Sequence, residues 1–75
     1  MYPTTTIEFA LPKRSTVKLT VLNLLGQELT TLVAEEKEAG VHRIVWNAEK
    51  YPSGVYLYRF EANGFVATRK MILLK

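Results

Sequence analysis

Residues 54–75 read GVYLYRFEANGFVATRKMILLK, and this stretch predicts two adjacent β-strands over residues 55–61 and 65–74. Between them, Asn63 and Gly64 form the residue pair that type I′ hairpin turns favour. The second run is apolar on both faces. A strand of this kind is either buried on both sides or exposes one apolar face to a partner. We therefore expect the terminal residues to be structural, a signal, or both.

The same two-residue period predicts four more strands nearer the N-terminus. They are expected over residues 6–11, 16–21, 27–33 and 41–47. The segment AEEKEA, residues 34–39, is too short for a stable helix and is expected to form an acidic, solvated loop. Six short strands separated by turns indicate an all-β fold, a small antiparallel sandwich of six to seven strands in a single domain, residues 1–75.

Two further local patterns complete this picture. Residues 23–26 (NLLG) predict a turn, in which Gly26 can adopt a positive φ and Asn23 can bond its own backbone. Residues 48–53 are expected to form a loop. The core should consist of the apolar residues that alternate along the strands, namely Ile7, Phe9, Leu11, Val17, Leu19, Val21, Leu29, Leu32, Ile44, Trp46, Tyr56, Tyr58, Phe60, Met71 and Leu73.

Composition argues against catalysis and against a metal or cofactor. The 75 residues contain no Cys and no Asp, so disulfides, thiolate metal sites and cysteine nucleophiles are excluded. His42 is the only histidine, and we expect its ring to pack near Trp46. Neither serine lies in a G-x-S-x-G motif, and the four glycines are too far apart to cradle a phosphate. The sequence therefore predicts a protein that is not an enzyme.

The net charge of +3 does not indicate a nucleic-acid partner. No basic run exceeds two residues, and Arg59, Arg69 and Lys70 alternate with core residues, as on a solvated strand face. An acidic or lipopolysaccharide-like partner is the alternative interpretation. The chain has no run of 18 apolar residues and no signal-peptide pattern at its start. If the parent protein is exported, we expect its targeting signal upstream and this chain to be a fragment.

Trp46 admits two interpretations. It is either the buried centre of the sandwich or, together with Tyr56 and Tyr58, part of a sugar-stacking platform.

Five short motifs occur in order along the chain: PTTTI at residues 3–7, NLLG at 23–26, G-x-H-x-x-x-W-N at 40–47, SGVY at 53–56 and KMILLK at 70–75. Together they resemble the type A C-terminal sorting domains of the type IX (Por) secretion system. These domains are similar to the immunoglobulin-like module of flagellar hook-capping proteins. The resemblance covers essentially the whole chain, although the Asn-Pro-rich lead-in usual before the Thr run is missing.

The resemblance implies an immunoglobulin-like β-sandwich at the end of a larger cargo protein. A separate N-terminal signal takes such a cargo through the inner membrane. In the periplasm the type IX machinery recognises the folded domain, and the cargo crosses the outer membrane to be released or joined to surface lipopolysaccharide. The domain is then a non-catalytic sorting signal, whose partners are the outer-membrane secretion machinery and the covalently attached cargo.

On this basis the terminal segment is expected to be recognised by the translocon, with strand addition as one mode. The expected recognition residues are Lys70, Met71, Ile72, Leu73, Leu74 and Lys75, and the expected structural motif residues are Gly26, Gly40, Trp46, Gly54, Tyr56 and Gly64. Self-association through the terminal strand stays open. Two alternatives also stay open: a hook-cap-like assembly module, and a surface- or carbohydrate-binding sandwich.

Overall fold

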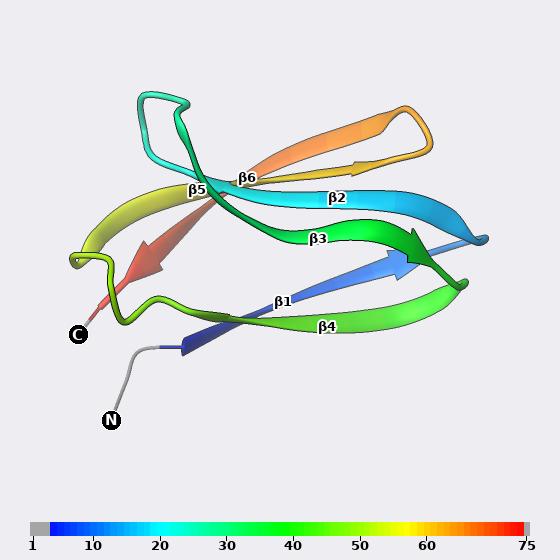
Figure 1. The fold of residues 1–75 in the computed structure, drawn as a ribbon, viewed down its shortest axis with the longest axis horizontal. Helices are drawn as coiled ribbons and strands as arrows, with labels where there is room; N and C mark the ends of the chain where they lie inside the picture. Colours follow the sequence, from blue (N-terminus) through cyan, green and yellow to red (C-terminus); the bar gives the residue numbers. More distant parts are fainter. Residues whose placement is uncertain (1–3, 75) are drawn as a thin grey trace.

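The computed structural model describes residues 4–74, which form six strands and no helix (Figure 1). In chain order the strands are β1 (Thr4–Leu11), β2 (Ser15–Leu22), β3 (Glu28–Lys37), β4 (Gly40–Asn47), β5 (Gly54–Ala62) and β6 (Phe65–Leu73). All neighbouring strands are antiparallel, and they form two sheets with the orders β1-β4 and β3-β2-β5-β6. The predicted all-β antiparallel sandwich is confirmed.

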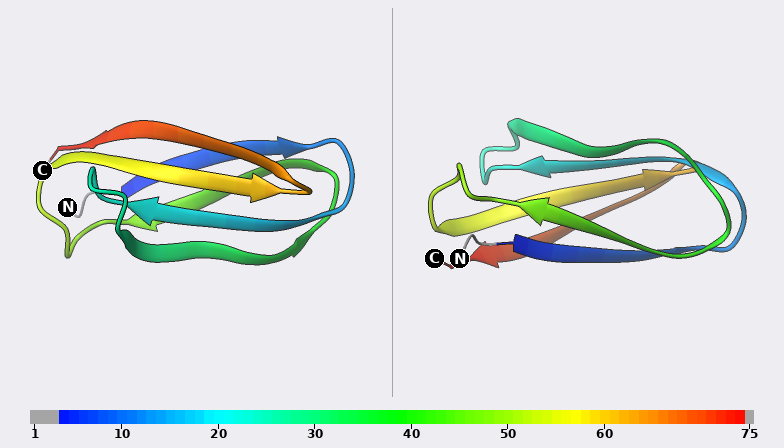
Figure 2. Two further views of the ribbon diagram at one scale, coloured as in Figure 1. Left: turned by 90° about the horizontal axis from the view of Figure 1, so that it is seen from above. Right: turned by 60° about the horizontal axis from the view of Figure 1, so that its bottom comes forward.

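Two connections stay within the larger sheet and three cross between the sheets. The β2–β3 and β5–β6 connections are hairpins, whereas the chain changes sheet at residues 12–14, 38–39 and 48–53. Figure 2 shows the two sheets facing each other, with the start of β1 and the end of β6 at the same end of the molecule. The last strand is therefore part of the fold and lies at one edge of the four-stranded sheet.

Both turns predicted from local sequence are present. The side-chain oxygen of Asn23 accepts hydrogen bonds of 3.0 Å from the backbone N–H groups of Leu25 and Gln27, and Gly26 has a φ of 83°. Asn63 and Gly64 have φ values of 50° and 81°. A type I′ turn needs positive φ at both central positions, which Asn and Gly adopt at little steric cost.

The core consists of two buried clusters, one at each end of the sandwich, and every residue predicted for the core lies in or against one of them. One cluster is built around Val17 and Leu19, which are both fully buried, and the other around Val21 and Trp46. The sequence did not single out four further apolar residues that the structure buries, namely Leu22, Val33, Ala48 and Ala62.

The predicted acidic loop at residues 34–39 is wrong over most of its length. β3 continues through this segment to Lys37, pairing Ala34 with Lys18 and Glu36 with Thr16 on β2. The alternation of β3 is blurred because its register against β2 shifts twice. A polar segment can still complete a strand when a neighbouring strand satisfies its backbone hydrogen bonds and its charges face solvent.

Candidate recognition surface

The terminal strand is held in place by its hairpin with β5. The register runs without a shift from Ala62 opposite Phe65 to Gly54 opposite Leu73. Because side chains alternate between the faces of a strand, this register determines which terminal residues face the core. Leu73 is 5% exposed and packs in the same cluster as Trp46, and Met71 packs against both clusters.

The other terminal residues point away from the core. Ile72 is 66% exposed and Leu74 is 79% exposed, and Lys70 is also exposed. The structure therefore divides the expected recognition segment: Lys70, Ile72 and Leu74 reach solvent, whereas Met71 and Leu73 belong to the core. Lys75 lies outside the described residues, as does Pro3 of the opening motif.

The exposed terminal residues belong to a larger apolar surface on the outer face of the four-stranded sheet. Val55 is the cross-strand partner of Ile72 and is 37% exposed, and Leu57 lies opposite Lys70. Val66, farther along β6, is 56% exposed. Singly exposed apolar residues are ordinary, but Val55, Ile72 and Leu74 follow one another at one end of the sheet, as at an interaction site.

Trp46 has a structural position. Only 3% of it is exposed, and its ring lies 5.3 Å from that of Tyr51 and 5.6 Å from that of Tyr56, measured between centroids. The Tyr56 hydroxyl donates a hydrogen bond to the carbonyl of Pro52. A tyrosine near the start of a strand that bonds the backbone a few residues upstream is a mark of immunoglobulin-like sandwiches. Trp46 has no open face on which a sugar could stack.

The predicted glycines mark turns and strand starts. Gly26 and Gly64 lie in the two hairpin turns described above, and Gly40 and Gly54 are the first residues of β4 and β5. The residues predicted as a structural motif are thus spread over both ends of the fold and do not form one site.

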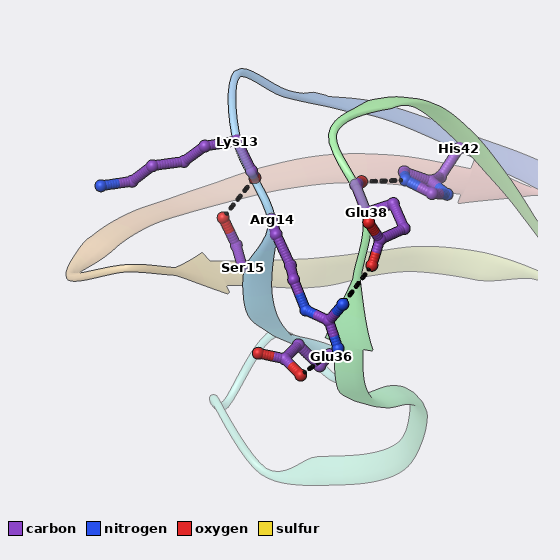
Figure 3. Close-up of polar contacts among 6 residues, drawn as sticks. All are labelled: Lys13, Arg14, Ser15, Glu36, Glu38 and His42. Carbon is purple, nitrogen blue, oxygen red and sulfur yellow. Dashed lines mark hydrogen bonds and ion pairs between the residues drawn. The ribbon is translucent and has the colours of Figure 1, made fainter.

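His42 does not pack against Trp46 as expected. Its ring stacks on Phe9, its cross-strand partner on β1, with centroids 5.3 Å apart. Its Nε2 atom donates a hydrogen bond of 2.7 Å to the carbonyl of Glu38 (Figure 3). Residues four apart on a strand are separated by roughly 13 Å, whereas direct cross-strand partners are about 5 Å apart. The cross-strand neighbour therefore determines the contact.

A cluster of charged residues closes the same end of the sandwich (Figure 3). The Arg14 guanidinium lies 2.6 Å from the Glu36 carboxylate and 2.7 Å from that of Glu38, joining the β1–β2 connection to the end of β3. The hydrogen bond to Glu36 raises the pKa of Arg14 and lowers the pKa of Glu36. Beside it, the Ser15 hydroxyl donates to the carbonyl of Lys13. All these charged groups are exposed and paired, which indicates a structural clamp.

The described part of the chain contains no group of three or more His, Cys, Asp or Glu residues that could hold a metal ion. Within it, no helix is long and apolar enough to cross a membrane.

Sequence reasoning missed the Arg14 clamp and the half-buried Tyr51. Arg14 and Glu36 are 22 positions apart, and no periodicity links them. Tyr51 follows β4 in a loop, where aromatic residues carry no strand signal, yet it packs on Trp46. Pro52 after it was one available signal, since Pro fixes its own φ and restricts the backbone of the residue before it.

These features define a class of protein: a small immunoglobulin-like β-sandwich without a metal-binding cluster in its described residues, in which β6 is a sheet edge with exposed apolar side chains. Residues 2–74 match the family of secretion system C-terminal sorting domains (Por secretion tail), and the chain belongs to that family. It is a non-catalytic C-terminal sorting domain of the type IX (Por) secretion system, which targets cargo for secretion across the outer membrane. Comparisons with curated proteins and with solved structures gave no match.

Proposed function

We propose that the outer-membrane secretion machinery recognises this domain through the exposed residues of its terminal segment, Lys70, Ile72 and Leu74, followed by Lys75. Membership of the sorting family implies a cargo on the N-terminal side and contact with the type IX machinery. The observation that carries the proposal is the exposure of two large apolar residues, Ile72 on a strand whose other face is anchored in the core and Leu74 directly after it.

Met71 and Leu73 have the complementary role in this proposal. They hold the strand in its register, so that the signal is displayed only by the folded domain. Recognition of a folded edge discriminates a folded sorting domain from an unfolded one. The chain is then one domain of a longer exported protein that passes through the periplasm and reaches the cell surface or the medium.

The test is a reporter with its own export signal, fused in front of the domain in a bacterium with a type IX system. We expect the double variant Ile72→Ser, Leu74→Ser to fold but to leave the reporter in the periplasm. The control is Val41→Ser, Val45→Ser, because these residues of β4 are similarly exposed, at 58% and 62%. The control should deliver the reporter normally.

Circular dichroism of both purified variants should show the β-sheet spectrum of the wild type, because all four positions lie on exposed faces. Normal surface delivery of the Ile72, Leu74 variant would contradict the proposal. Loss of delivery with both variants would show that exposed apolar side chains matter in general and that the terminal segment has no special role.

A further inference from the structure

The four-stranded sheet has two edges, and they differ in regularity. β6 pairs with β5 through nine residue pairs without a shift, whereas the β2–β3 register shifts after Leu19 and again after Val21. Bulges twist an edge strand and hinder the addition of another strand. Among the described strands of this sheet, β6 is therefore the edge best suited to accept one.

The hairpin turn determines which backbone groups of β6 face outward. In a type I′ turn the carbonyl of Ala62 accepts from the N–H of Phe65, and along an antiparallel pair hydrogen-bonded and non-bonded residues alternate. Val66, Thr68 and Lys70 consequently direct their N–H and C=O groups away from β5. In agreement, the Thr68 carbonyl accepts a hydrogen bond of 3.3 Å from the guanidinium of Arg69.

Beside this edge lies an apolar groove between β6 and β1. Phe9 and Ala10 of β1 line one wall, and Phe65, Ala67 and Arg69 of β6 line the other. Figure 2 shows β1 and β6 on the same side of the sandwich. Phe65 is 61% exposed although it points towards the interior side of the sheet, so an added segment would cover apolar surface as well as pair with the backbone.

The charges in and beside the groove are mainly positive. Arg69 lines its β6 wall, Lys13 lines an adjoining pocket that shares Ala10, Phe60 and Phe65 with the groove, and Lys70 lies on the outer face of β6. Glu8 also lines the groove, but its carboxylate is 3.0 Å from the Arg43 guanidinium and so is already neutralised. This distribution favours a partner that carries acidic side chains.

The same charges disfavour a second copy of the chain as that partner. Antiparallel pairing of two β6 strands about a two-fold axis centred near the middle of the strand places Arg69 opposite Arg69 in one register and Lys70 opposite Lys70 in the next. Like charges directly opposite each other destabilise a strand pair. These registers are thus disfavoured for a second copy, whereas no like charge opposes an acidic strand.

We propose that the β1–β6 groove receives an extended, acidic polypeptide segment, which adds to β6 as a further strand through the outward N–H and C=O groups of residues 66–72. Main-chain hydrogen bonds provide affinity in such strand addition, and side-chain pockets and charges provide specificity. An acidic side chain of the segment lies near Arg69 or Lys70. That the donor is a protein of the secretion machinery rests on the function proposed above.

A peptide titration tests this directly. The probe is a nine-residue peptide, the length of β6, that alternates Val and Thr and carries Glu at two central positions. The control peptide has the same sequence with Lys at those two positions. In ¹⁵N NMR spectra of the whole chain, the Glu peptide should shift the amides of Val66, Thr68 and Lys70. The Lys peptide should bind at least about tenfold more weakly. The double variant Arg69→Glu, Lys70→Glu should reverse this order.

Substitutions at Thr68 test the main-chain contact. Thr68→Pro removes an outward N–H but no hydrogen bond to β5, and proline is tolerated on edge strands. It should abolish binding of the Glu peptide, while Thr68→Val, which keeps the N–H, should bind as the wild type does. Equal binding by both peptides, unaltered binding to Thr68→Pro, amide shifts on β1 instead of β6, or a dimer of the wild-type chain by sedimentation would each overturn the inference.

The reporter assay separates this inference from the proposed function. Thr68→Pro should leave the reporter in the periplasm and Thr68→Val should not. If Ile72→Ser, Leu74→Ser blocks delivery but Thr68→Pro does not, the terminal recognition segment stands and strand addition is refuted. If only Thr68→Pro blocks delivery, strand addition stands and the terminal recognition segment is refuted.

Discussion

Alternate residues of the terminal strand should have separable roles, and this can be measured at Leu73 and Ile72. Leu73→Ala removes three carbons from a buried side chain that is 5% exposed and packs with Val21, Trp46 and Tyr56. Ile72→Ala removes three carbons from a neighbour that is 66% exposed. The two substitutions have nearly the same chemistry and differ mainly in the face of the strand that they change.

The expected magnitudes differ widely. Replacing a Leu buried in this way by Ala lowers the free energy of unfolding by about 2–5 kcal/mol. Because the structure can relax near the end of an edge strand, we expect a loss of about 2–3 kcal/mol for Leu73→Ala. Exposed positions usually change stability by less than about 0.5 kcal/mol, which we expect for Ile72. A chain of 75 residues has a total stability of only about 3–5 kcal/mol. Leu73→Ala should therefore leave a substantial unfolded fraction near 37 °C.

Thermal unfolding followed by circular dichroism measures the difference. At about 4–8 °C per kcal/mol for a domain of this size, Leu73→Ala should lower the midpoint by roughly 10–20 °C and Ile72→Ala by less than about 4 °C. Leu73→Met, which conserves volume, should lose under about 1.5 kcal/mol. Equal shifts for Leu73→Ala and Ile72→Ala would refute the assignment of the two faces of β6.

Two other predictions concern stability alone. The buried Thr20 hydroxyl finds no hydrogen-bond partner within residues 4–74 and lies beneath the Arg59–Glu28 ion pair that spans β2. Thr20→Val should therefore raise the free energy of unfolding in urea by about 1 kcal/mol. A lower urea midpoint for the variant would contradict this prediction. The hydrogen bond from Arg14 lowers the pKa of Glu36 from its ordinary value of 4.5. The stability that this ion pair gives the fold is therefore fully present above the ordinary pKa and is lost as the pH falls through the lowered pKa. The wild type should have a higher urea midpoint than Arg14→Met at pH 7 but not near pH 2. A difference in midpoint that does not change with pH would exclude the Arg14–Glu36 ion pair as its cause.

Local sequence was sufficient for the hairpins and for most of the core. Asn63-Gly64 and Asn23 with Gly26 act through their own φ angles and neighbouring amides, which no distant residue has to supply. The inward set of alternating apolar residues follows from strand geometry in the same way. The strand end at Lys37 could not be predicted, because pairing with β2 stabilises residues whose own composition indicates a loop.

The sequence predicted only part of the recognition surface. Alternation separates Met71 and Leu73, which the sequence predicted both for the core and for recognition, from Ile72 and Leu74, but it does not decide between these two roles. That choice depends on the cluster around Trp46, built from β2, β4, β5 and the β4–β5 loop.

Strand number, hairpin positions, the apolar set and membership of the sorting family were all encoded in short stretches of this chain, because turn chemistry and side-chain alternation act between near neighbours. The tertiary structure alone placed β6 at a sheet edge beside β1, seated His42 on Phe9 and joined Arg14 to Glu36. Those relations depend on which strands become adjacent. Adjacency is settled by how the two sheets bury their apolar faces together, a property of the whole chain that no single segment carries.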